Sequence, residues 1–123
     1  MAKLLYQNIT YKIIGALFET YNTLGYGYQE KYYQRALEEE FKKRNLLYEK
    51  ELPIKLTYNN TNIGRYFIDF LIEKKIIFEI KVANGLYQKD MNQVLAYLKT
   101  KQFKLGILAI FSKKGLKYKR IIN

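Results

Sequence analysis

Two stretches with the alternation of a β-strand, joined by three polar residues, constrain the fold of this chain more than any other feature. The stretches span residues 65–72 and 76–82, and the connection is Glu73-Lys74-Lys75. Isoleucine and aromatic residues dominate both stretches, and a connection this short joins neighbouring strands that run antiparallel. The sequence therefore predicts a β-hairpin as the central element of the fold.

Helical and strand periodicities on either side complete the expected order of elements. Apolar residues at helical spacing predict three helices, over about 10–24, 29–44 and 86–100. Strand patterns predict three more strands, over 48–58, 105–111 and 116–122. Asn8 or Thr10 is the expected N-cap of the first helix, and Gly25 its stop. The order α-α-β-β-β-α-β-β contains no repeat or linker, so residues 1–123 are expected to form a single α/β domain.

The composition excludes whole classes of enzyme. The 123 residues include no histidine and no cysteine. This rules out Ser-His-Asp and Cys-His hydrolases, zinc fingers, zinc hydrolases and histidine-dependent nucleases, because each needs an imidazole or a thiolate. Catalysis would have to use carboxylates, lysine, tyrosine or a hard metal ion such as Mg²⁺, which prefers oxygen ligands.

The chain is strongly basic, with 22 lysines and arginines against 11 acidic residues and a formal net charge of +11. The excess lies after residue 40, and no acidic residue follows Asp90. This distribution indicates a polyanionic partner, nucleic acid or an acidic membrane surface. No apolar stretch approaches the roughly 18 residues of a spanning segment, so we expect a soluble cytoplasmic protein without a membrane-bound part.

Because strand side chains alternate, the predicted hairpin has an apolar face and a charged face. The apolar face is expected to be core and holds Tyr66, Ile68, Phe70, Ile72, Ile76, Phe78, Ile80 and Val82. The other face sets Asp69, Glu79 and Lys81 among large apolar side chains. If the connection is a three-residue loop, Asp69 lies directly opposite Glu79.

Two carboxylates placed in this way repel each other and lose solvation, which costs several kcal/mol unless a cation or a proton joins them. A divalent metal ion would relieve that cost, and Lys81 could then reach a phosphate or a water at the metal. The alternative is a partly solvated ion cluster at the end of a strand. We favour the metal site because, of three Glu-x-Lys triplets, only Glu79-Ile80-Lys81 lies in an apolar strand opposite an aspartate.

Asp69 followed ten residues later by Glu79-Ile80-Lys81 resembles the signature of the PD-(D/E)xK nuclease superfamily. The residue before Asp69 is Ile68 rather than the proline of the nominal pattern. Upstream, the segment 27–33 reads G-x-x-E-x-x-Y and resembles the small prokaryotic GxxExxY proteins. Downstream, the segment 93–97 resembles the Q-x-x-x-Y motif of RecB-like members. The resemblance implies a restriction-endonuclease-like core, an α-β-β-β-α-β mixed sheet flanked by helices, with an extra N-terminal helix and a C-terminal strand.

The resemblance also implies roles for individual residues. Asp69, Glu79 and the carbonyl of Ile80 would hold Mg²⁺ or Mn²⁺, and Glu30 would complete the metal shell or hold Lys81. Lys81 would orient the attacking water or stabilise the transition state. The side chains of Gln93 and Tyr97 would position the substrate or the lysine. In the upstream motif, Gly27 could simply permit a turn, Tyr33 could be packing, and Glu30 could simply favour the N-terminal end of a helix.

The resulting hypothesis is a metal-dependent nuclease that hydrolyses DNA phosphodiester bonds, with RNA open as an alternative substrate. Five basic residues would contact the phosphate backbone or else form a solvated edge: Lys113, Lys114, Lys117, Lys119 and Arg120. One alternative is a catalytically inactive nuclease-fold module or subunit that binds nucleic acid. Another alternative is that the chain's 13 tyrosines include a surface group that forms a protein interface. A homodimer formed in this way would suit an enzyme that cuts both strands of a duplex.

Overall fold

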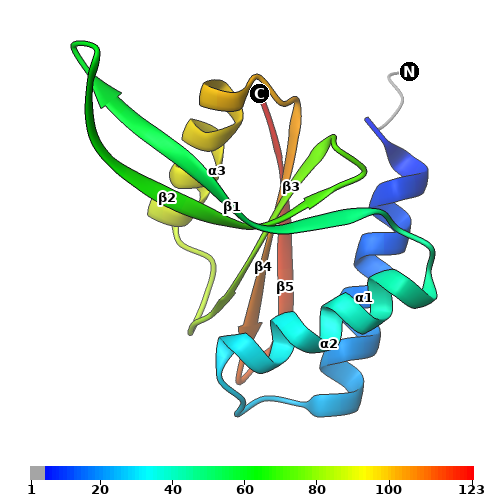
Figure 1. Cartoon of the computed structure of the whole chain (residues 1–123). Coiled ribbons are helices and arrows are strands. Elements are labelled where there is room, and N and C mark those ends of the chain that lie inside the picture. Colours follow the sequence, from blue (N-terminus) through cyan, green and yellow to red (C-terminus); the bar gives the residue numbers. More distant parts are fainter. Residues whose placement is uncertain (1–4) are drawn as a thin grey trace, which may run out of the picture.

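The structure, a computed structural model, describes residues 5–123. In chain order the elements are α1 (Gln7–Leu24), α2 (Glu30–Lys43), β1 (Tyr48–Tyr58), β2 (Thr61–Ile72), β3 (Ile76–Val82), α3 (Gln88–Lys101), β4 (Leu105–Ser112) and β5 (Gly115–Ile122) (Figure 1). This order confirms the prediction. Neither Asn8 nor Thr10 caps α1, however, because the helix starts earlier, and its N-cap is Tyr6 with a left-handed φ of 54°. None of the helices within residues 5–123 combines the length and apolar character needed to span a membrane.

The five strands form one mixed sheet in the order β1-β2-β3-β4-β5. Strands β3 and β4 run parallel, with α3 connecting them, and the other neighbours are antiparallel. Helices α1 and α2 cover one face of the sheet and α3 covers the other (Figure 1). The hairpin is therefore enclosed on both faces near its turn, which explains why both of its faces carry apolar residues there.

Two apolar clusters hold these layers together. On the α1 and α2 side, Leu37 and Phe41 pack on Phe70 and Phe78, all fully buried or nearly so. On the α3 side, the buried side chains are mainly Val94, Leu98, Leu108 and Ile110. Gly106 lets α3 approach β4 closely, because a Cβ at this position would lie 2.6 Å from Cγ1 of Val94. Each such buried side chain contributes about 1.5–3 kcal/mol relative to exposure.

An irregularity in β1 and β2 changes one prediction. Lys50 pairs with Phe70 and Leu52 with Ile68, so the residues between them, Glu51 and Asp69, fall at a break in the ladder. Glu51 has a left-handed φ of 55°, which turns the strand here without inserting a residue, because the register is the same on both sides. As a result the alternation resets: Phe70 belongs to the α1 and α2 side, whereas Ile68 packs on the α3 side.

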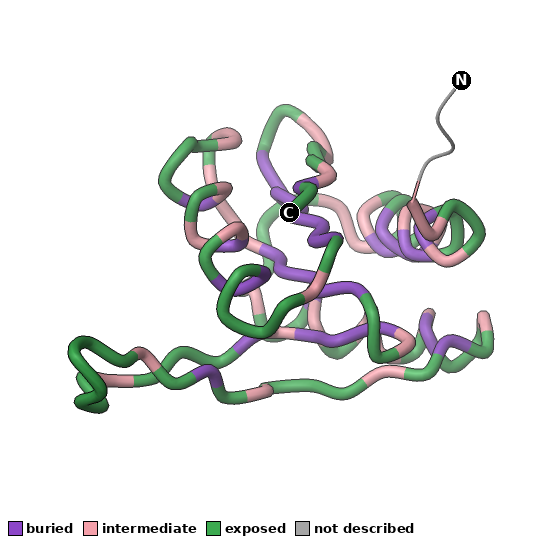
Figure 2. Tube along the Cα trace, turned by 90° about the horizontal axis from the view of Figure 1, so that it is seen from above, coloured by how far each residue is buried: buried purple, intermediate pink, exposed green. Residues whose placement is uncertain are grey.

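The expectation that Tyr66 and Ile68 share a face with Phe70 is therefore wrong. The Tyr66 ring lies 5.7 Å from that of Tyr97 on α3, which places it on the same side as Ile68. Strand β2 pairs with β3 from Phe70 to Ile72 and with β1 along its length, so the rest of the β1–β2 hairpin projects from the body as an arm (Figures 1 and 2).

Candidate active site

Asp69 and Glu79 meet where β2 separates from β3. The Asp69 backbone N–H donates to Oε1 of Glu79 at 3.1 Å, and the Ile80 backbone N–H donates to Oδ2 of Asp69 at 2.9 Å. The two carboxylates thus accept hydrogen bonds from backbone groups that the interrupted ladder leaves free. Glu79 is 8% exposed, so the pair lies largely out of solvent.

Helix α2 supplies a further partner for this pair. Nε2 of Gln34 donates to Oδ1 of Asp69 at 3.0 Å, which fixes the second oxygen of that carboxylate. Glu30 begins the same helix, one turn earlier, and is half-buried. Gln34 was not predicted as a site residue, although its spacing of four residues from Glu30 puts both on one helical face.

Burial, reinforced at Glu79 and Glu30 by the negative charge of Asp69, makes these carboxyl groups favour protonation. Burial, followed by the negative charge of Asp69, raises the pKa of Glu79 to about 9. Burial raises the pKa of Asp69 as well, against the opposing effect of its hydrogen bonds and of Lys81. Burial and the charge of Asp69 raise the pKa of Glu30, while Lys81 lowers it. These three acidic groups and Lys81 therefore act on one another electrostatically.

Helix α3 closes the site on the other side. Asp90, 9% exposed in the first turn of α3, places Oδ1 3.9 Å from Nζ of Lys81. Tyr97 is buried, and burial together with the charge of Glu79 raises the pKa of its hydroxyl, whereas Gln93 lowers it. Asp90 was not predicted as a site residue. Its position three residues before Gln93, on the same helical face, was the available signal.

The donor set suits a hard divalent cation. Asp69 and Glu79 provide carboxylate oxygens and Ile80 a backbone carbonyl, and Mg²⁺ is commonly held by one or two carboxylates with water and phosphate completing its shell. A cation would also offset the burial that raises the pKa of both carboxyl groups, and at Glu79 the repulsion by Asp69 that adds to it. Within residues 5–123 no three carboxylates converge into a ready metal cage, so two would carry most of the binding.

The family of the chain follows from a comparison over nearly its whole length. A family model of the PD-(D/E)XK nuclease superfamily matches residues 7–121. The chain belongs to the PD-(D/E)XK nuclease superfamily. Members of this superfamily are usually nucleases that use divalent metal ions. The narrower resemblances, to GxxExxY proteins and to the Q-x-x-x-Y motif, stay predictions.

A solved structure confirms the fold of this superfamily member. The structure titled "Crystal structure of SSO0001" matches with a TM-score of 0.56 and 19% sequence identity, over 95% of this chain and 58% of that chain. The present chain thus spans less than two thirds of that protein. No curated protein matches the chain.

In this nuclease-superfamily chain, the upstream motif has a structural part. Gly27 has a φ of 123°, which glycine adopts readily, in the loop between α1 and α2. Tyr33 is fully buried, and its ring stacks on that of Phe111 with the ring centroids 4.2 Å apart. Its hydroxyl donates to the Gly25 carbonyl at 2.5 Å. These contacts anchor the loop that leads into Glu30, and they do not place Tyr33 at the carboxylates.

The basic residues of the C-terminal hairpin divide between the two faces of the sheet. Lys81 pairs with Ile110 and Ile110 with Lys117, and Glu79 is linked in the same way through Leu108 to Lys119. Lys117 and Lys119 thus share a face with Glu79 and Lys81, two strands away, or about 10 Å. Lys113 and Lys114 are exposed in the β4–β5 turn.

Arg120 lies on the opposite face from Lys117 and Lys119. Its guanidinium donates to Oγ1 of Thr10 at 3.2 Å and to the Leu5 carbonyl at 3.0 Å. Arg120, which was predicted to contact phosphate, therefore uses its guanidinium to connect β5 to the start of α1.

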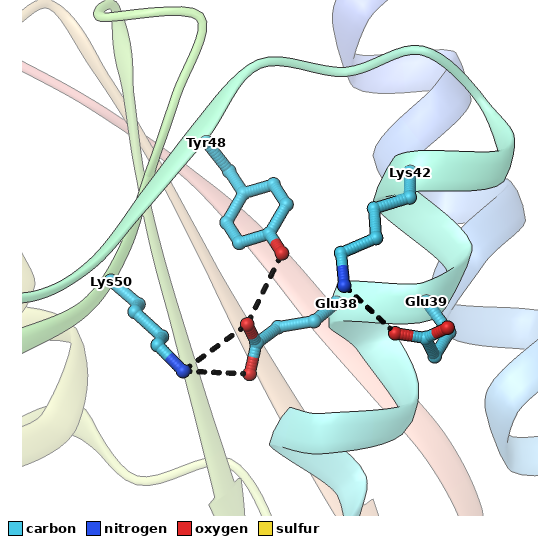
Figure 3. A network of polar contacts seen from close by, with 5 residues as sticks. All are labelled: Glu38, Glu39, Lys42, Tyr48 and Lys50. Carbon is cyan, nitrogen blue, oxygen red and sulfur yellow. Dashed lines mark hydrogen bonds and ion pairs between the residues drawn. The ribbon is translucent and has the colours of Figure 1, made fainter.

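A cavity of about 180 Å³ opens beside Asp69. It is lined by Lys31, Gln34, Arg35, Glu38, Lys50, Glu51, Asp69 and Phe70. A polar network at its rim joins α2 to β1: the Tyr48 hydroxyl donates to Oε1 of Glu38 at 3.1 Å, and Nζ of Lys50 lies 3.3 Å from that oxygen (Figure 3). Asp69 is thus reachable from the α2 side.

Proposed function

We propose that this chain is a metal-dependent nuclease that hydrolyses phosphodiester bonds of DNA with Mg²⁺ or Mn²⁺. The observation that carries the proposal is the buried pair Asp69 and Glu79, joined through backbone hydrogen bonds of 3.1 and 2.9 Å next to a cavity. Keeping two carboxylates together out of solvent is unfavourable for stability alone, and a divalent cation would offset it. Membership of the PD-(D/E)XK superfamily supports the same chemistry.

The residues of the site have distinct tasks in this proposal. Asp69, Glu79 and the Ile80 carbonyl would hold the cation, and Glu30 would complete its shell or hold Lys81. When bound, the cation would supply an activated water and offset negative charge on the scissile phosphate. Gln34 is a positioning residue in this scheme, because its hydrogen bond fixes the orientation of the Asp69 carboxylate.

Lys81 would contribute positive charge beside the scissile phosphate and orient the attacking water. Asp90, 3.9 Å away, holds the ammonium group on the α3 side of the sheet. Gln93 and Tyr97, on the same helix, would position substrate or Lys81. Lys117 and Lys119, two strands further along the same face, would contact phosphates without reading sequence.

The test is a cleavage assay on plasmid and on single-stranded DNA in Mg²⁺ or Mn²⁺. We expect cleavage by the unaltered chain, and losses of at least about 100-fold for Lys81→Ala and Asp69→Asn. Lys74→Ala, in the exposed β2–β3 turn, is the matched control and should cut normally. Thermal melts of each variant separate loss of activity from loss of the fold.

Two results would contradict the proposal. Equal cleavage by Lys81→Ala would place the activity elsewhere or in a contaminant. Salt-sensitive DNA binding that persists in chelator, with no cleavage under any metal condition, would instead support a nuclease-fold binding module.

A further inference from the structure

The projecting part of the β1–β2 hairpin, residues 52–68, has a surface that the catalytic proposal does not use. We call this segment the ribbon. Figures 1 and 2 show it extending away from α1 and α2 and past α3, with most of its length exposed. Its base is fixed, because Ile54 and Ile68 are buried against the α3 side and Tyr66 contacts Tyr97 at 5.7 Å. The ribbon is thus an arm with a defined direction that starts next to Asp69.

The charge of the ribbon points to an anionic partner. Its seventeen residues contain no aspartate or glutamate and two cations, Lys55 and Arg65. These two residues are directly paired across the strands, an arrangement that destabilises a hairpin. Among residues 5–123 neither forms an ion pair. A like-charged pair on an exposed arm is unfavourable for folding, but it is favourable for binding a polyanion.

The two cations lie on a definite face of the ribbon. The cross-strand pair Ile54 and Tyr66 points to α3, so the neighbouring pair Lys55 and Arg65 points the other way. The Arg65 guanidinium carbon lies 5.1 Å from the centroid of the Phe67 ring, which steadies that side chain. Following the alternation toward the body, this face runs through Phe67 to Asp69.

Two observations favour a nucleic acid over a second copy of this chain. Strand β1, which forms one edge of the sheet, carries Pro53, the left-handed Glu51 and a register shift between Leu56 and Thr57. A proline and bulges are features that prevent a further strand from pairing with an edge. The exposed face is also cationic, so two copies would repel each other there.

We propose that the Lys55 and Arg65 face of the ribbon binds the phosphate backbone of double-stranded DNA adjacent to the cleavage site. A two-stranded ribbon fits a groove of B-form DNA. On the face that carries the two cations, the Phe67 ring lies under the Arg65 guanidinium, whereas single strands are commonly held by free aromatic faces. Arg65 and Asp69 are four positions apart, about 13 Å along the strand, so the contacted phosphates lie about four base-pair steps from the scissile bond. The inference rests on the proposed nuclease function for the position of the cut.

The test measures binding of a 30-base-pair duplex and of a matching single strand by fluorescence anisotropy in chelator, so that no cleavage is needed. Lys55→Gln with Arg65→Gln is compared with Lys12→Gln and Lys74→Gln, which remove the same charge from exposed positions on α1 and in the β2–β3 turn. The ribbon variant should lose about tenfold in duplex affinity, and the slope of log K against log salt should fall by about 2. The control pair should lose less than about threefold, and the ribbon variant should melt no lower than the unaltered chain.

Each outcome has a separate meaning. Equal losses for ribbon and control variants, an unchanged salt slope, or no duplex binding by the unaltered chain at about 50 mM salt would overturn the ribbon inference. A shift from dimer to monomer in sedimentation velocity, caused by the ribbon variant alone, would overturn it in favour of a contact between copies. If the ribbon effect is found but no metal condition gives cleavage, the nuclease proposal fails and the ribbon surface stands.

Discussion

Replacing Glu79 by glutamine tests the physical basis of the site without any assay of activity. The pKa of Glu79 is raised from 4.5 to about 9 in the folded chain, by burial and then by the charge of Asp69. Between these values the folded state holds a proton that the unfolded state has released. The free energy of unfolding, as far as it depends on Glu79, is therefore highest below about pH 4.5 and decreases as the pH rises toward 9.

The magnitude follows from the size of this interval. A pH of about 7.5 lies about three units above the pKa of the Glu79 carboxyl group in the unfolded chain, and each unit is equivalent to about 1.36 kcal/mol. The metal-free chain therefore loses up to about 4 kcal/mol that Glu79→Gln retains, because the amide needs no proton and its oxygen can still accept from the Asp69 backbone N–H. Asp69 shares the proton, so we expect a gain of about 2–4 kcal/mol, or a melting temperature higher by about 8 °C or more.

The assay is thermal and urea unfolding in chelator, from about pH 5 to pH 9. The advantage of Glu79→Gln should be near zero at the acidic end and grow with pH. Glu49→Gln, at an exposed position of β1, should follow the unaltered chain at every pH. Adding about 10 mM Mg²⁺ should stabilise the unaltered chain and not Glu79→Gln; for a dissociation constant of about 1 mM the gain is about 1.4 kcal/mol. Parallel pH profiles for Glu79→Gln and the unaltered chain would refute the reasoning.

Two further predictions concern the frame around the site. Gly106→Ala should destabilise the chain by about 1–3 kcal/mol in urea unfolding, because the new Cβ would lie 2.6 Å from Val94; an unchanged midpoint would show that α3 moves away freely. Arg120→Met should lower stability by about 1–3 kcal/mol through loss of its bonds to Thr10 and Leu5. Its affinity for DNA should stay within about twofold of the unaltered chain in the anisotropy titration, whereas a tenfold loss would return Arg120 to the phosphate surface.

The sequence predicted the parts of this fold that depend on local periodicity. The bounds of β3 were predicted because an apolar run ends at a polar turn on one side and at Asn84-Gly85 on the other. Tyr66 was placed on the wrong face because the break at Glu51 and Asp69 depends on how two strands twist together. The alternation of side chains along the sequence of one strand does not indicate where such a break occurs.

The candidate site was predictable to a similar degree. Asp69 and Glu79 could be brought together because they belong to one hairpin with a short turn. Gln34 and Asp90 could not, because each lies on a helix whose position over the sheet is set by packing far from the site. Spacing within a helix shows which residues share a face, but not what that face touches.

The separation of β2 from β3 links the site to the ribbon. Where the ladder stops, the backbone N–H groups of Asp69 and Ile80 lose strand partners, and the two carboxylates accept from them instead. The same break releases the remainder of β2 to follow β1 outward, so that Lys55 and Arg65 project from the point where the carboxylates meet. A regular ladder through Asp69 would satisfy those N–H groups by backbone carbonyls and would extend β3 alongside the ribbon. The carboxylates would then lose the hydrogen bonds that orient them, and the arm would lose its free edge. One local irregularity therefore accounts for both features.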